Sequence, residues 1–299
     1  MRLTEIESIV GTLTSRDGKF QSLGFVADGH TGLLVFLEEA KFLAALRRNY
    51  TVTAVLTTPA LAASVPSGLA VATSPEPRTA FANLHNQLAR CGFYWEDFPT
   101  VIHPDAAIHP TAWVAERNVR IGAGSVVAPN ATILERCLLG ESVVVGAGAV
   151  LGAVGFQSVR GTRPMLEMDH AGGLILQDRV HVLPGAVIAT GVFHEPTMIS
   201  ADCRIGSQAF VSHTAHLGER VFIGHGSVIN GYFAIGAGSW IGPGAVVSQR
   251  VHIGDKAFVS LGAVVIGNLA AGARVSGNFA IPHRRLLRML ADADSGSPT

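Results

Sequence analysis

The sequence predicts a mainly β protein, in which a parallel β-helix of six-residue repeats follows a small N-terminal α/β domain. Three observations carry this prediction. An aliphatic residue recurs every six residues from about residue 102 onward, the first 99 residues lack that period, and the 299-residue chain contains 34 glycines, which favour tight turns. We therefore expect an α/β domain at 1–99, a β-helix at 100–279, and a C-terminal helix and tail at 280–299.

The six-residue period is unbroken from Ile199 to Val265, and shorter runs precede it at 108–151 and 176–188. A period of six fits neither the 3.6-residue period of an α-helix nor the alternation of a long strand. It fits short strands joined by tight turns, each with one inward aliphatic side chain, which stack as a solenoid. Three hexads then make one triangular coil.

Two segments interrupt the period, at 158–173 and 189–198. Both are too irregular to continue a coil, so we expect loops that leave the β-helix. Loops on a rigid scaffold often carry function, and these two are candidates for the wall or lid of a substrate cleft. The alternative is that they are insertions tolerated at the corner of a coil.

The ends of the chain follow other patterns. We expect helices at 3–10, 39–48 and 81–90, with strands at 33–38 and 52–58, and prolines punctuate the connections. Near the C-terminus, residues 282–291 predict a short basic amphipathic helix that begins with proline.

Composition narrows the possible partners. Lys+Arg and Asp+Glu are both 22, so no net charge recruits nucleic acid. The three cysteines, Cys91, Cys137 and Cys203, form no close pair, which favours a reducing compartment. No apolar run resembles a signal peptide or reaches the roughly 18 residues that a transmembrane segment needs. We expect a cytoplasmic protein.

Nearly the whole chain resembles one family. The stretch LTEIESIVG and the following α/β segment, the GAVGF sequence at 152–156, the hexad array and the ending NFAIPHRRLLRML resemble the UDP-3-O-acylglucosamine N-acyltransferases of the lipid A pathway. The resemblance implies left-handed winding and a homotrimer. It also implies acyl transfer from an acyl carrier protein or coenzyme A thioester to the amino group of a nucleotide-linked amino sugar, without a bound cofactor or metal.

The resemblance also assigns catalytic residues. The family motif I-x-x-Q-x-x-I-x-H reads Ile205-Gly-Ser-Gln208-Ala-Phe-Val211-Ser-His213 here, which places the catalytic base at His213. A histidine suits this role because its pKa lies near neutrality. The family's oxyanion donor, a glycine amide one coil later, falls on Gly231, and Tyr232 beside it becomes a candidate substrate contact.

Other family positions differ in this chain. The family's uracil pocket reads Phe36, Glu39 and Phe42, where glutamate replaces an amide that both donates and accepts hydrogen bonds. A second family histidine is replaced by Arg250, a candidate phosphate or pantetheine contact. His170 aligns near a polar position of the family's cleft. These differences predict the same chemistry on a different acceptor.

Several alternatives stay open at this stage. The segment at 210–247 also resembles sugar N- and O-acetyltransferases that use acetyl-coenzyme A, and the altered pocket would also suit a sugar-nucleotide-binding scaffold without catalysis. A zinc carbonic anhydrase on the same repeat is disfavoured because His213 and His216 have the wrong spacing. We expect His216 and His252 at the surface and His225 on another face. The terminal helix, with His283, Arg284, Arg285 and Arg288, would either contact an acidic carrier protein or stabilise a trimer.

Overall fold

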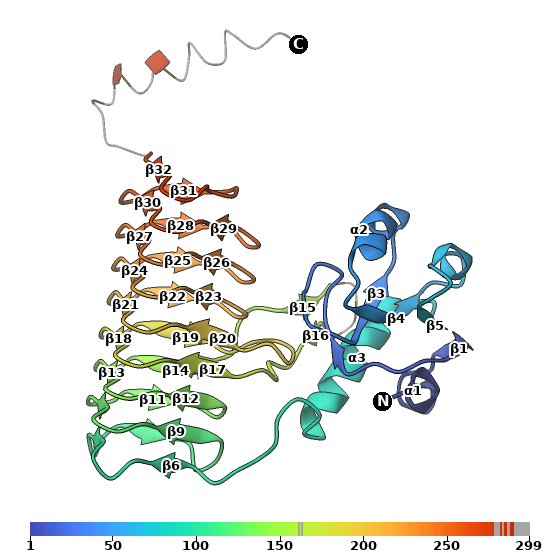
Figure 1. The fold of residues 1–299 in the computed structure, drawn as a ribbon, viewed down its shortest axis with the longest axis horizontal. Helices are drawn as coiled ribbons and strands as arrows, with labels where there is room; N and C mark the ends of the chain where they lie inside the picture. Colours follow the sequence, from blue (N-terminus) through green and yellow to red (C-terminus); the bar gives the residue numbers. More distant parts are fainter. Residues whose placement is uncertain (161, 163, 278–281, 283, 286–287, 290–299) are drawn as a thin grey trace.

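The computed structural model describes residues 1–160, 162, 164–277, 282, 284–285 and 288–289. Its main feature is a column of stacked coils that begins with β6 and ends with β32, and the N-terminal domain lies against one side of this column (Figure 1). Almost all strands of the column are two or three residues long, as the six-residue period predicts.

The column has three faces, each a parallel sheet that takes one strand from every coil. The first face contains β6 (Val101–Ile102), β9 (Val119–Ile121), β12 (Cys137–Leu139), β17 (Leu174–Leu176), β20 (Thr197–Ile199), β23 (His216–Leu217), β26 (Ala234–Ile235) and β29 (His252–Ile253). The second contains β7 (Ala107–Ile108), β10 (Val126–Val127), β13 (Val144–Val145), β18 (His181–Val182), β21 (Arg204–Ile205), β24 (Phe222–Ile223), β27 (Trp240–Ile241), β30 (Phe258–Val259) and β32 (Arg274–Val275). The third contains β8 (Trp113–Val114), β11 (Thr132–Ile133), β14 (Val150–Ala153), β19 (Val187–Ala189), β22 (Phe210–Val211), β25 (Val228–Ile229), β28 (Val246–Val247) and β31 (Val264–Val265).

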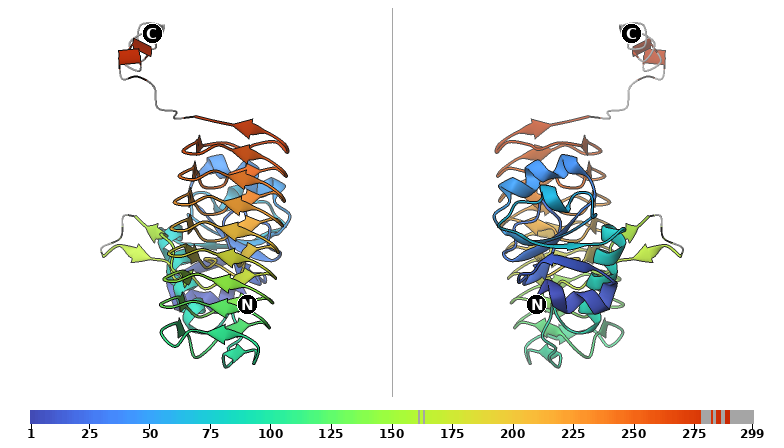
Figure 2. Two further views of the ribbon diagram at one scale, coloured as in Figure 1. Left: turned by 90° about the vertical axis from the view of Figure 1, so that its left-hand side faces the viewer. Right: turned by 90° about the vertical axis from the view of Figure 1, so that its right-hand side faces the viewer.

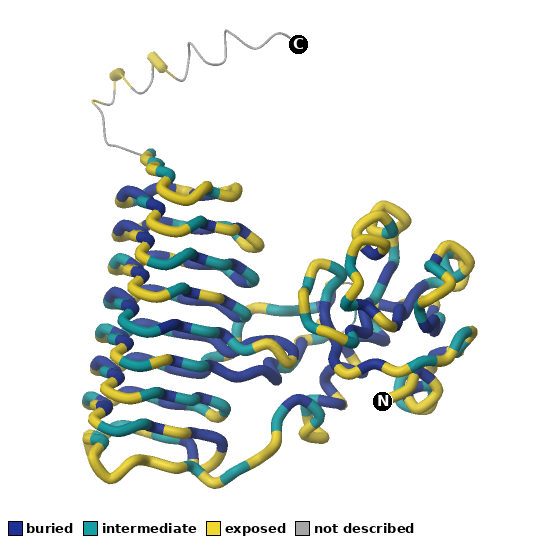
Figure 3. The backbone as a smooth tube through the Cα atoms, in the orientation of Figure 1, coloured by how far each residue is buried: buried dark blue, intermediate teal, exposed yellow. Residues whose placement is uncertain are grey.

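The hexad aliphatics fill the interior of this column. The second residue of a typical strand points inward, and Ile205, Val211 and Leu217 in successive strands are each 0% exposed. Figure 3 shows the same alternation of buried and exposed backbone in coil after coil. Because each fully buried aliphatic side chain contributes roughly 1.5–3 kcal/mol, the repeat itself supplies the driving force that stacks the coils.

The N-terminal domain is a five-stranded sheet in the order β1-β5-β4-β3-β2, with only β1 antiparallel to its neighbour. Its elements are α1 (Leu3–Val10), β1 (Leu13–Arg16), β2 (Ser22–Leu23), β3 (Leu33–Leu37), the 3₁₀ turn η1 (Ala40–Phe42), α2 (Leu43–Arg48), β4 (Val52–Thr57), η2 (Ala62–Ser64), β5 (Ala70–Thr73) and α3 (Pro77–Arg90). The expected helix at 39–48 is divided between η1 and α2, and the helix expected at 81–90 begins four residues earlier, at a proline whose fixed φ suits the first turn.

The two interruptions of the repeat connect the column to this domain. Within 158–173 the chain forms the hairpin β15 (Ser158–Val159) and β16 (Leu166–Glu167), which projects from the coils (Figure 2). Val159 and Met168 from this segment and Val192 and Phe193 from the second interruption are buried in the same hydrophobic cluster as α3. Both segments therefore join the two parts of the molecule.

Polar contacts hold the first interruption against α3. The Asn86 side chain donates to the Glu167 carbonyl at 2.7 Å and accepts from the Asp169 amide at 2.9 Å. His85 lies beside it, with Nε2 2.7 Å from the Asp169 carbonyl oxygen and Nδ1 2.9 Å from the Tyr94 hydroxyl. Burial lowers the pKa of His85 to about 4, so this ring is a neutral structural link.

The expected C-terminal helix lies mostly outside the described residues. Arg284, Arg285, Arg288 and Met289 are helical, whereas His283 is not described. Among the described residues, no helix combines the length and hydropathy needed to cross a bilayer.

Candidate active site

His213 lies at the corner between β22 and β23, on the side of the column that faces the N-terminal domain. Its side chain is nearly closed off from solvent, with the residue 5% exposed. The aliphatic pattern explains this position, since Val211 anchors the strand before the corner and Leu217 anchors the strand after it. The catalytic role predicted for His213 stays a prediction, and the surrounding geometry shows what the ring could do.

Two glycines leave the space that the His213 ring occupies. A Cβ on Gly231 would lie 2.5 Å from His213 Cε1 and 2.8 Å from Nε2. On another side of the ring, a Cβ on Gly155 would lie 2.6 Å from His213 Cδ2 and 2.7 Å from Nε2 of His170. These distances are far inside normal carbon–carbon contact, so any larger residue would displace the ring.

The Gly231 amide is available as a hydrogen-bond donor. At the same position of two other hexads, which lie at other corners of the column, the amide is capped: Ser207 N–H donates to His225 Nδ1, and Ala237 N–H donates to Asp255 Oδ1, each at 2.9 Å. The buried Gly231 N–H donates to no protein acceptor in the part of the chain that the structure describes. Unpaired buried amides are rare, so this one is a candidate donor to a ligand oxygen.

His170 reaches the same place from the first interruption of the repeat. Its ring centre lies 5.3 Å from that of His213, in an edge-to-face arrangement. The Gly155 N–H donates to His170 Nε2 at 3.0 Å, so a neutral His170 carries its proton on Nδ1. The irregular segment that the sequence analysis gave as a candidate cleft wall or lid thus places a second imidazole beside the first.

Both imidazoles are neutral at ordinary pH. Burial, and then the neighbouring His170 and Arg250, lowers the pKa of His213 to about 4. Burial also lowers the pKa of His170. A neutral histidine has a free lone pair and can accept a proton, which is the state that a general base requires.

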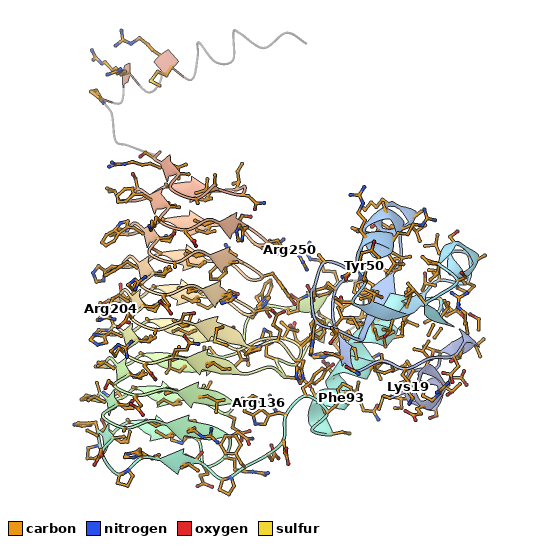
Figure 4. The ribbon with its side chains drawn as sticks, viewed as in Figure 1. Lys19, Tyr50, Phe93, Arg136, Arg204 and Arg250 are labelled. Atoms are coloured by element: carbon orange, nitrogen blue, oxygen red, sulfur yellow. The ribbon has the colours of Figure 1, made fainter. Side chains whose placement is uncertain are left out.

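Tyr232 and Arg250 extend the site toward the N-terminal domain. They occupy the same corner as His213 in the next two coils, where Tyr232 N–H donates to the His213 carbonyl and Arg250 N–H to the Gly231 carbonyl, each at 3.1 Å. The Tyr232 ring centre lies 5.0 Å from that of His213, and the Arg250 guanidinium lies 4.6 Å from the Tyr232 ring centre. Figure 4 shows Arg250 at the edge of the column that faces the N-terminal domain.

Arg250 also contacts two residues of the N-terminal domain that the sequence did not single out. Its guanidinium lies 5.3 Å from the Phe25 ring centre and 3.7 Å from Asp28 Oδ1. Burial raises the pKa of Asp28 to about 6, although the Phe25 amide and Arg250 oppose this increase. Arg250 is therefore shared between the two parts of the molecule, and only about two-fifths of its side chain is exposed.

A cleft of about 460 Å³ opens at this junction. Its lining includes Phe36, Glu39 and Phe42, the three positions predicted to hold a flat group, together with Arg250. Phe36 is half-buried, with the Arg78 guanidinium 5.4 Å from its ring centre, whereas Phe42 is 44% exposed. Arg250 thus lies between the predicted binding residues of the N-terminal domain, with which it lines the cleft, and Tyr232, which contacts His213.

The remaining histidines lie farther from this arrangement. His216 and His252 are exposed on β23 and β29, where they line a second cleft of about 390 Å³ that Arg250 and Tyr232 also border. His225 accepts the capping hydrogen bond described above and lies at another corner. Within the described ranges, no three His, Cys, Asp or Glu side chains gather closely enough to hold a metal ion.

Sequence reasoning missed Phe25, Asp28, Arg78 and Gly155. The first three lie in the cleft between the α/β domain and the column or make contacts across it. Such contacts leave no periodic pattern in the sequence. Gly155 belongs to the GAVGF segment that carries part of the family resemblance, but nothing local distinguishes it from a turn glycine.

Comparison with known proteins identifies the six-residue repeat. Residues 118–153 match the family described as bacterial transferase hexapeptide (six repeats). Together with the three parallel faces, this match confirms the predicted fold class, a left-handed parallel β-helix with a small N-terminal α/β domain. A solved structure, the UDP-N-acetylglucosamine O-acyltransferase of Moraxella catarrhalis, is 20% identical with a TM-score of 0.48, over 63% of this chain and 77% of that one.

Curated relatives have a higher sequence identity over the residues that align. The UDP-3-O-acylglucosamine N-acyltransferase of Azorhizobium caulinodans is 28% identical over 259 residues, which cover 75% of this chain and 72% of that protein. The enzyme of the same name from Caulobacter vibrioides is 29% identical over 119 residues, but this match spans only 31% of that protein. The enzyme of the same name from Herminiimonas arsenicoxydans is 26% identical over 167 residues, 46% of this chain and 45% of that protein.

Proposed function

We propose that this chain, a divergent acyltransferase related to the UDP-3-O-acylglucosamine N-acyltransferases, transfers an acyl group from a phosphopantetheine thioester to the amino group of a nucleotide-linked amino sugar. The relationship and the hexapeptide match support the reaction class. The observation that carries the finer proposal is the pairing of a neutral buried imidazole, His213, with the Gly231 N–H, which has no acceptor among the residues that the structure describes.

This pairing suits the two demands of acyl transfer. The attacking amine must lose a proton, and neutral His213 accepts it as the nitrogen–carbon bond forms. The thioester carbonyl oxygen becomes negative in the tetrahedral intermediate, and the Gly231 N–H donates to it. When the intermediate collapses, the carbon–sulfur bond breaks, the product is an amide, and the proton held by His213 passes to the departing thiolate.

The acceptor would extend from this site across Arg250 into the cleft of the N-terminal domain. In this arrangement, Phe36 and Phe42 contact the base, Arg250 contacts the phosphates, and Tyr232 contacts the sugar beside His213. Arginine suits phosphate because its planar fork donates several hydrogen bonds. His170 lines the reacting end opposite Gly231.

We also propose that the chain works as a homotrimer. Large hydrophobic side chains remain exposed on the second and third faces of the column, including Phe222, Trp240, Trp113, Val228 and Val264. Exposed apolar residues that gather on the surface of a protein mark an interaction site. Sedimentation equilibrium tests this part, and a monomer at micromolar concentration would contradict it.

The activity itself is tested by thiol release. The protein is incubated with an acyl thioester on a carrier protein or on coenzyme A, together with an amino-sugar nucleotide, and free thiol is measured. Mass spectrometry of the sugar then separates an amide product from an ester. Thiol release that depends on the sugar and yields an amide supports the proposal. Ester formation would favour O-acylation, and tight sugar-nucleotide binding without thiol release from either donor would favour a binding scaffold.

A further inference from the structure

The cleft between the two parts of the molecule has a composition that suits one base in particular. Its volume of about 460 Å³ lies in the usual range for small-molecule sites. Three aromatic residues, Phe25, Phe36 and Phe42, line it, and its polar groups are two glutamates and two arginines. Aromatic walls with a few polar groups at the edge are the usual means of holding a nucleobase.

The two glutamates are not equivalent. Glu38 is fully engaged by Arg78, since its Oε2 lies 2.9 Å from Nε and 2.8 Å from Nη2, and its Oε1 accepts from the Arg78 amide at 3.3 Å. Glu39 pairs through Oε2 with Lys41 at 2.6 Å, and half of its side chain is exposed. Exposed pairs of this kind are weak. Glu39 is therefore the carboxylate that a ligand in the cleft can engage.

A carboxylate only accepts hydrogen bonds, and the bases differ in what they offer it. The edge of guanine presents two adjacent donors, N1–H and the N2 amino group, which match the two oxygens of a carboxylate. Uracil presents one N–H between two carbonyl oxygens, which a carboxylate repels. Adenine and cytosine each present one amino group beside a ring nitrogen lone pair. Guanine alone offers two donors to a single acidic side chain.

We propose that this cleft binds the guanine base of a guanosine diphosphate-linked amino sugar, with Glu39 as the residue that selects the base. The aromatic rings hold the flat faces of the base, and Arg250 lies at the end of the cleft toward His213, where the diphosphate would follow. The inference rests on the proposed function for the sugar and its amine. The choice of base is independent of catalysis, because binding is measured without turnover.

Isothermal titration calorimetry of the full chain with GDP, UDP, ADP and CDP tests the proposal. We expect GDP to bind at least tenfold more tightly than UDP. In Glu39→Gln, GDP binding weakens about tenfold, whereas UDP binding strengthens, because an amide both donates and accepts. The matched control, Glu116→Gln, changes an exposed glutamate on the column and leaves all four affinities unchanged.

The result that overturns the proposal is a UDP affinity equal to or greater than that of GDP, or a Glu39→Gln variant with unchanged preference. Absence of binding by all four nucleotides overturns it as well. If GDP binds as expected but no acyl donor releases thiol, the base assignment stands and the proposed acyl transfer fails, so the two failures are distinguishable.

Discussion

The substitution Gly231→Ala tests the geometry of the site most sharply, because it keeps the backbone N–H and changes only the space beside His213. The added Cβ would lie 2.5 Å from His213 Cε1. Normal carbon–carbon contact is about 3.5 Å or more, so the ring has to move by roughly 1 Å. Gly231 does not require a positive φ, so the backbone itself tolerates alanine.

A shift of this size in a catalytic group lowers turnover by about 100-fold, which corresponds to about 2.7 kcal/mol in the activation barrier. Overpacking should also lower the free energy of unfolding by about 1–3 kcal/mol. Nucleotide affinity should stay unchanged, because the cleft of the N-terminal domain is not altered. The assays are thiol release under saturating substrates, calorimetry with the nucleotide and thermal unfolding.

The matched control is Gly267→Ala, since a Cβ at that position would meet no atom within 4 Å. It should leave all three measurements near those of the unchanged protein. Gly155→Ala, whose Cβ would meet both imidazoles, should resemble Gly231→Ala. If Gly231→Ala folds and retains turnover within threefold, the packing argument is refuted, and Gly231 would act through its amide alone.

Three further predictions concern charge and protonation. Burial lowers the pKa of His213 from 6.5 to about 4, so its contribution to the free energy of unfolding is complete above pH 6.5 and decreases by about 3 kcal/mol as the pH falls toward 4, at 1.36 kcal/mol per pKa unit. When urea unfolding is compared at pH 7.5 and 4.5, His213→Asn should lose less of its free energy of unfolding than the unchanged protein. Equal losses in the two proteins would contradict this prediction. His170→Asn should raise the pKa of His213, because charge on His170 lowers it; an imidazole titration by NMR checks the direction, and an unchanged pKa would count against the coupling. Arg250→Lys keeps the charge but loses the ring contacts with Tyr232 and Phe25. The affinity for a nucleoside diphosphate, measured by calorimetry, should therefore fall about tenfold, or about 1.4 kcal/mol. An unchanged affinity would show that Arg250 is not part of the binding site.

The sequence predicted the column well because each strand of a coil depends on one local rule. A single inward aliphatic per hexad decides the strand, its register and its face, so positions such as Ile205 and Val211 follow directly from the period. The same register places His213, Gly231 and Arg250 at one corner in successive coils, although it was the family resemblance that singled them out.

The contacts between the two parts of the molecule could not be predicted in this way. Phe25 and Asp28 meet Arg250 across more than 200 residues of sequence, and nothing near them is periodic. The hairpin β15–β16 was expected only as an irregular loop, since its position depends on Asn86 and His85 of α3. Strands β1, β2 and β5 were missed because each is short and carries no clear alternation.

The central claim is that His213 is the base of an acyl transfer, and His213→Ala under single-turnover conditions tests it most directly. The variant and the unchanged protein are each saturated with an acyl thioester and an amino-sugar nucleotide, and amide formation is followed while nucleotide affinity is measured in parallel. General base catalysis contributes about 10²–10⁴-fold. We expect a loss of at least 100-fold in the rate of amide formation with unchanged nucleotide affinity, and a rate within tenfold of the unchanged protein would contradict this claim.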